Sequence, residues 1–198
     1  MTERRHSEFP IDLEALMKGL QASPNADLVT RPTGRAVREA IEAAIADSAP
    51  HVAVSVIDFT GVRVLDFSCA DEVVARLLLR YLPPERPGNV FFLFRGVEEI
   101  HGHAVAEVLA RHGLAAVCDF GEGAFGLLGS TTREERTAWS TLERRKRISA
   151  GMSASLLGSR GDAMLHRLSE RRLAYFDPAG SASSLSALAR PVPPRDEP

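Results

Sequence analysis

The chain has 198 residues, of which 44% are hydrophobic and 25% charged, and its formal net charge is −2. This composition is typical of a soluble globular protein with one large domain or two small ones. No apolar run approaches the roughly 20 residues of a transmembrane helix, and residues 1–10 lack the apolar core of a signal peptide, so we expect a cytoplasmic protein with no membrane partner.

The first part of the chain predicts a tail, a helix, a short strand and a longer helix. Residues 1–9 are polar and are predicted to be disordered, and apolar residues at helical spacing predict a short helix over residues 11–20. A break at residues 23–25 precedes a short strand at 27–30. Thr33 is placed to cap a helix over residues 34–46.

The stretch from residue 51 to residue 82 organises the chain. A β-branched apolar run at residues 52–56 predicts a strand that is buried on both faces. A second short run, at 62–65, leads to Ser68 and Asp71, which together resemble a capping box. Helical spacing of apolar residues continues from 70 to 82, where two prolines end the helix. A strand thus delivers residues 66–68 to a helix N-terminus, with its free backbone N–H groups and positive dipole end.

The next elements repeat this alternation. An apolar run at 89–94 predicts another buried strand, and residues 97–112 predict a helix with Ile100 among its inward-facing residues. Gly113 ends that helix at the usual position, and residues 114–117 predict a last strand. The alternation of strands and helices over residues 24–120 predicts an α/β domain, a mixed sheet covered by helices.

A resemblance rests on the segment IDFTGVRVLDFSCADEVVARLL. It resembles the STAS domain, the fold of anti-sigma-factor antagonists, and it is closest to a STAS-like family whose segment reads roughly hDF-x-x-V-x-x-h-x-x-SFADE, where h is apolar. Asp58-Phe59 matches the first part, and residues 68–72 (SCADE) match the second with Cys in place of Phe. The resemblance covers residues 26–120.

The STAS resemblance implies a domain that binds a partner protein, such as a regulatory kinase or a sigma-factor regulator, and that is usually not an enzyme. In the antagonists, a Ser directly after an Asp at this helix start is switched by phosphorylation. Here Phe67 follows Asp66, and the hydroxyl comes one place later. The partner-binding residues that the resemblance implies are Asp66, Phe67, Ser68, Cys69, Asp71 and Glu72.

Residues 121–190 predict a second domain, and the Pro-rich residues 191–198 a disordered tail. Residues 124–128 are a strand or an extended linker, and Thr132 opens a charged helix. A short helix at 153–157, a third helix from 161 to about 172, and a turn at 177–180 between two short strands (174–176 and 184–188) follow. Three helices followed by a hairpin resemble a winged helix-turn-helix, a small α+β domain in which the third helix enters the DNA major groove. The resemblance implies base contacts from Arg160, His166 and Arg167 and phosphate contacts from Arg144, Arg145, Lys146 and Arg147.

Charge leaves two interpretations of this second part open. Residues 131–198 carry 12 Lys/Arg and 8 Asp/Glu, whereas residues 1–130 carry 12 and 18. Such asymmetry fits a DNA-binding part beside a partner-binding part, and it can also arise by chance. The chain is then either a transcription-related regulator that binds both partner and DNA, or a partner-switching module whose basic helices are solvated or bind protein.

A third interpretation is a thiol-dependent or hydrolytic enzyme that uses Cys69. A helix N-terminus stabilises a thiolate, and His101, His103 or His112 could offer a base. However, Cys69 replaces an apolar residue of the family pattern, and both cysteines of the chain lie in apolar stretches, which predicts buried thiols without a disulfide. No zinc spacing and no Gly-rich phosphate loop is present. We therefore expect no catalytic residue, no metal and no cofactor, and the sequence does not predict the oligomeric state.

Overall fold

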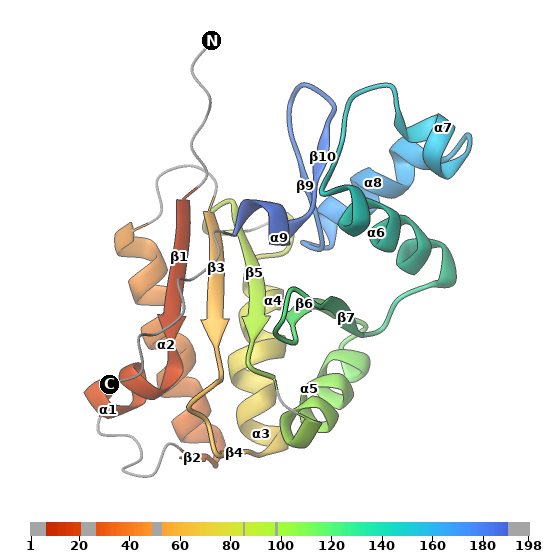
Figure 1. Cartoon of the computed structure of the whole chain (residues 1–198). Helices are drawn as coiled ribbons and strands as arrows, with labels where there is room; N and C mark the ends of the chain where they lie inside the picture. Colours follow the sequence, from red (N-terminus) through yellow and green to blue (C-terminus); the bar gives the residue numbers. More distant parts are fainter. Residues whose placement is uncertain (1–6, 21–26, 49–52, 85, 98, 190–198) are drawn as a thin grey trace.

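A mixed sheet of five strands forms the centre of the protein (Figure 1). The computed structural model describes residues 7–20, 27–48, 53–84, 86–97 and 99–189. The strands lie in the order β1-β3-β5-β6-β7, and all are parallel except β7, which runs antiparallel to β6 at one edge. The chain is therefore α/β with a mixed sheet, as predicted. The strands are β1 (Ser7–Asp12), β3 (Ala53–Asp58), β5 (Val90–Arg95), β6 (Ala115–Asp119) and β7 (Phe125–Gly129).

Helices from the first part of the chain cover one face of this sheet. Alternate residues of the central strands, such as Ile57, Phe92 and Phe94, point into this first core, because successive side chains of a strand face opposite ways. A two-stranded parallel ladder, β2 with β4, lies at the end of the sheet where the parallel strands finish. These elements are α1 (Leu13–Leu20), β2 (Asp27–Leu28), α2 (Arg31–Ser48), β4 (Val64–Leu65), the continuous helix formed by α3 (Phe67–Ala70), η1 (Asp71–Arg76) and α4 (Leu77–Arg80), and α5 (Glu99–Arg111).

The C-terminal unit, residues 131–189, covers the other face of the sheet. Val54, Val56, Phe91 and Leu93 of the sheet share one core with Trp139 and other apolar residues of this unit. In Figure 1 the unit lies over the end where the parallel strands begin, with α9 crossing near β3 and β5. Its elements are α6 (Arg133–Arg145), β8 (Arg147–Ile148), α7 (Ser153–Leu157), α8 (Gly161–Glu170), β9 (Tyr175–Phe176), β10 (Ala182–Ser183) and α9 (Leu185–Leu188), and the three strands form an antiparallel sheet in the order β8-β10-β9.

A buried arginine joins the C-terminal unit to the sheet. Arg172 is only 2% exposed; its Nε donates to the Tyr81 carbonyl at 3.0 Å and its Nη1 to Asn89 Oδ1 at 2.7 Å. Its guanidinium also lies 4.6 Å from the centre of the Phe91 ring, while Nη2 has no hydrogen-bond partner among the described residues. Burial lowers the pKa of Arg172 to about 10. Tyr81 closes α4, so the charge lies at the negative end of a helix dipole, with no ion pair to a carboxylate of the described residues.

Several predicted boundaries are corrected by the fold. Residues 7–9 were predicted to be disordered, but they belong to β1, which pairs with β3. Thr33 does not cap α2, which begins at Arg31 with Pro32 in its first turn, where the fixed φ of proline suits a helix. β7 pairs with β6, so the predicted domain boundary at residue 120 falls inside the sheet. In place of the strand predicted at 184–188, β10 is followed by the short helix α9.

Other predictions are confirmed to within a few residues. The buried strands β3, β5 and β6 and the helices α5, α7 and α8 lie where their patterns placed them. Thr132 caps α6 through a reciprocal capping box with Glu135. The predictions for residues 1–6 and 191–198 lie outside the described residues. Across the described part of the chain, no helix has the length and apolar content needed to cross a membrane.

Candidate functional site

The start of α3 is fixed by the side chain of Asp66. Its Oδ1 accepts the backbone N–H of Cys69 at 2.7 Å and the hydroxyl of Ser68 at 2.8 Å, and its Oδ2 accepts the backbone N–H of Thr30 at 2.9 Å. Burial alone would raise the pKa of Asp66, but these hydrogen bonds outweigh it and lower the pKa. The predicted cap, Ser68, is therefore corrected to Asp66, whose two oxygens accept three donors, whereas the serine hydroxyl donates to it.

Cys69 is a buried structural thiol. It is 0% exposed, and its Sγ donates to the carbonyl of Thr30 at 2.9 Å. Burial, together with the nearby charge of Asp66, raises the pKa of Cys69 to about 12. Burial likewise raises the pKa of Cys118 to about 12. Because a thiolate is the reactive form of cysteine, this geometry does not place Cys69 as a nucleophile.

Asp71 and Glu72 form the centre of an ion-pair network beneath the helix start. They are 7% and 1% exposed. Arg31 Nη1 donates to Asp71 at 2.7 Å and to Glu72 at 3.0 Å, Arg38 Nε lies 3.2 Å from Glu72, and His112 Nε2 lies 2.7 Å from Asp71. Burial would raise the pKa of Asp71, but hydrogen bonds from Arg31 and His112 outweigh it and hold the pKa far below its usual range. The two carboxylates thus connect η1 to α2 and to His112, the residue that directly follows α5.

The helix widens into a π-helix over this same segment, Asp71–Arg76. A π-helix brings residues five apart onto one side, and here Arg76 Nε lies 3.1 Å from Asp71 Oδ2. Three of the six residues implied as partner contacts, Cys69, Asp71 and Glu72, are therefore interior. They support the surface around the helix start from the interior and are not themselves exposed on it.

An exposed apolar surface surrounds the helix start instead. We call it the helix-start patch: Val29, Val64, Phe67 and Ile100, which are 38%, 46%, 46% and 66% exposed. The Phe67 ring meets His103 of α5 edge-on, with 5.8 Å between ring centres. The patch lies at the lower end of Figure 1, where β2, β4 and the beginnings of α3 and α5 come together. Several exposed apolar side chains in one place mark an interaction site more strongly than scattered ones.

Most of the helix-start patch was missed by sequence reasoning. Only Phe67 had been implied as a contact, and Ile100 was predicted to face inward. In α5 the buried face contains His101, Ala104 and Val105, which leaves Ile100 just outside it. The sequence does not show whether a single apolar residue at the edge of the apolar face of a helix is buried or exposed, because the packing of the neighbouring elements decides its burial.

The residues implied as base contacts on α8 are engaged within the protein. Arg167 Nε lies 2.9 Å from Glu135 Oε1, and Glu135 is 1% exposed. The His166 ring lies against Phe176, with 3.9 Å between ring centres. Arg160 is 81% exposed, and its Nη2 lies 3.8 Å from Glu134. Arg160 is the most exposed of the three, and the Arg167 side chain, although paired with Glu135, is still 60% exposed.

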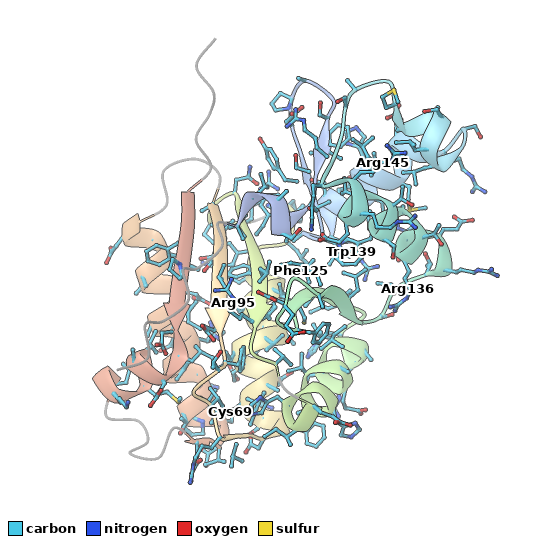
Figure 2. The ribbon with its side chains drawn as sticks, in the orientation of Figure 1. Cys69, Arg95, Phe125, Arg136, Trp139 and Arg145 are labelled. Atoms are coloured by element: carbon cyan, nitrogen blue, oxygen red, sulfur yellow. The ribbon has the colours of Figure 1, made fainter. Side chains whose placement is uncertain are left out.

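The basic run that ends α6 and follows it, residues 144–147, divides into two pairs. Arg144 and Arg145 are exposed and have no ion pair among the described residues. Lys146 is paired with Glu143, and it lies 5.2 Å from the Phe125 ring centre. Figure 2 marks Arg145 on α6, far from Cys69 at the opposite end of the molecule. The fourth residue of the run, Arg147, lies 2.9 Å from Asp177 and so braces the hairpin.

Comparison of the chain with family models, with curated proteins and with solved structures gave no match. Among the described residues, no group of three or more His, Cys, Asp or Glu side chains is arranged to hold a metal ion.

Proposed function

We propose that this chain is a protein-interaction module that binds a partner protein through the helix-start patch. The observation that carries the proposal is the exposure of Phe67 and Ile100, 46% and 66%, on two helices, α3 and α5, that are in contact through Phe67 and His103 at the end of the sheet that the C-terminal unit leaves uncovered. Aromatic side chains, phenylalanine among them, are enriched where proteins meet. The resemblance to STAS-like domains supports a partner from the class of regulatory kinases or sigma-factor regulators.

The scaffold under the patch supports the same proposal. Asp66 binds both the helix start and Thr30 beside β2, and the ion pairs of Asp71 and Glu72 fasten the helix to α2. A surface that is already ordered loses little conformational freedom on binding, so more of its contact energy appears as affinity. Ordering of the surface is thus a role for the buried charges of Asp71 and Glu72 that requires no catalysis.

The test uses a matched pair of substitutions on the same continuous helix. Phe67→Ser removes the patch aromatic, and Leu79→Ser removes another exposed apolar side chain, 42% exposed, from the far end of the helix. Affinity capture from the source cell should recover a defined protein with the unmodified chain and with Leu79→Ser, and lose it with Phe67→Ser. Equal recovery by both variants would remove the patch from the partner interface.

A second candidate function, DNA binding, is favoured by the topology of the C-terminal unit. The order α6-β8-α7-α8-β9-β10, with β10 between β8 and β9, is the order of a winged helix-turn-helix. A non-enzymatic regulator would then bind a partner at one end of the molecule and nucleic acid at the other. Its direct test is binding of the full chain to duplex DNA as salt is raised, since phosphate contacts give a steep dependence on salt.

A further inference from the structure

The outer side of α6 is a basic surface separate from the residues assigned above to base contact. The α6 arginine face consists of Arg133, Arg136 and Arg144 together with Thr137, Ser140 and Thr141, and these residues line one shallow hollow of about 300 Å³. Figure 2 marks Arg136 and Trp139 on the same helix. Trp139, with Ala138 and Leu142, is buried against the core, so the opposite side of the helix carries the arginines.

The arginines on this face are not paired with carboxylates among the described residues, unlike Arg167 on α8. All three arginines are exposed. Arg136 donates to the Thr131 hydroxyl at 2.8 Å, and none of the three has a carboxylate within ion-pair distance among the described residues. On α8 and just after it, by contrast, Arg167 and Arg171 both bind Glu135. Within the described part of the C-terminal unit, the exposed arginines that have no carboxylate partner therefore all lie on α6.

The spacing of the face suits an extended polyanion. Arg133 and Arg144 are eleven positions apart, which on an α-helix is about 16 Å, the axial length of about five nucleotides of one strand of duplex DNA. A guanidinium is planar and binds a phosphate through two parallel hydrogen bonds. The hydroxyls of Thr137 and Thr141 donate to backbone carbonyls one turn back. The side chains between the arginines are therefore small and uncharged.

The chemistry of the face favours nucleic acid over a lipid surface. A helix that binds a membrane places apolar side chains in the lipid beside its basic residues, whereas every strongly apolar residue of α6 faces the protein core. α8 is the poorer phosphate ligand, because it exposes a carboxylate near each end, Asp162 and Glu170.

We infer that the α6 arginine face binds the phosphate backbone of duplex DNA and is the main contact of the C-terminal unit with nucleic acid. This inference rests on the second candidate function and deepens it. Of the residues on this face, only Arg144 was implied as a phosphate contact by the sequence. The inference adds Arg133 and Arg136, makes α6 and not α8 the main contact, and assigns the face a role that depends on charge and not on base sequence.

The test compares two triple variants of the full chain. The first replaces Arg133, Arg136 and Arg144 with Gln. The second makes the same change of charge outside the C-terminal unit, at the exposed Arg35, Arg80 and Arg111. Binding of a random-sequence 25-base-pair duplex is measured by fluorescence anisotropy at several salt concentrations, and circular dichroism verifies that each variant is folded. We expect the α6 variant to bind at least tenfold more weakly at low salt and to flatten the slope of log K against log salt by about 2–3, since each phosphate contact contributes roughly 0.9; the second variant should stay within threefold of the unmodified chain.

Other outcomes separate the failure of this inference from the failure of the function. If the unmodified chain binds DNA and the α6 variant binds within threefold of it, while Arg160→Gln weakens binding, the α6 contact is overturned and DNA binding through α8 remains. If the unmodified chain shows no binding at low salt, both are overturned. Binding to phosphatidylserine vesicles, with no binding to the duplex and with the same loss in the α6 variant, overturns the inference in favour of a lipid ligand.

Discussion

Arg172 offers the most direct test of how the two halves of the molecule are joined. Its guanidinium donates to the Tyr81 carbonyl and to Asn89 Oδ1 and lies over the Phe91 ring. The substitution Arg172→Met keeps an unbranched side chain of similar length and removes the charge and both donors. The Tyr81 carbonyl then loses a donor within a buried interface.

The magnitude follows from two opposing effects. Two hydrogen bonds from a charged donor contribute roughly 1.5–3 kcal/mol each, and a cation over an aromatic ring adds roughly 0.5–2 kcal/mol. Burial opposes this, because lowering the pKa of Arg172 from 12.5 to about 10 costs the charged form about 3 kcal/mol. We therefore expect Arg172→Met to lower the free energy of unfolding by about 0.5–5 kcal/mol.

Urea unfolding measures this effect with two probes. Trp139 is the single tryptophan of the chain and lies in the core shared by the C-terminal unit and the sheet, while circular dichroism reports on all helices. Both probes should follow one transition in the unmodified protein, because the core is shared. Arg145→Met is the control, since Arg145 is exposed, and it should change stability by no more than about 0.5 kcal/mol. A loss below 0.5 kcal/mol for Arg172→Met, or a Trp139 transition separate from circular dichroism in the unmodified protein, would refute the reasoning.

Three further predictions concern the region around the helix start. Asp66→Ala should cost about 1–2 kcal/mol in thermal or urea unfolding, as loss of an N-cap does, and more than Ser68→Ala; the opposite order would restore the serine as the cap. The pKa of Asp71 is depressed in the fold, so the stability that its ionised form contributes is complete above the unfolded pKa of about 3.9 and is lost as pH falls through the lower folded value. Melting temperatures measured from pH 6 to pH 2 should therefore fall less steeply in Asp71→Asn than in the exposed Glu170→Gln. Equal slopes in the two variants would contradict the ion-pair account. Cys69, whose pKa is raised to about 12, should resist iodoacetamide at pH 7.5 in the folded protein and react after denaturation, as followed by mass spectrometry, and rapid labelling of the folded protein would argue for an accessible thiolate.

The central strands could be predicted because both of their faces are buried. A strand covered on two sides must be apolar at nearly every position, and the runs around Val54 and Phe91 have that character. The start of α6 was predictable for a local reason, since Thr132 and Glu135 satisfy each other within four residues. Such features need no knowledge of distant parts of the chain.

The features that sequence reasoning missed depend on contacts between distant residues. Ser68 and Asp66 are both suitable caps by spacing, and Asp66 is the one whose second oxygen binds Thr30, 36 positions away. Arg172 belongs to a pair of adjacent arginines, of which Arg171 binds Glu135 while Arg172 enters the interface. Nothing in the local sequence distinguishes the two, because the docking of the C-terminal unit decides which of them is buried.

The shared core also has a consequence for the order in which the protein is made. The sheet face that contains Val54 and Phe91 is covered by residues 131–189, which leave the ribosome after all five strands. At roughly 5–20 residues per second, these last residues take about 3–12 s to synthesise. During that interval the growing chain carries an uncovered apolar sheet face of the kind that molecular chaperones bind. A chain that stops near residue 130 would keep that face exposed permanently, so translation that ends early should yield a protein that aggregates.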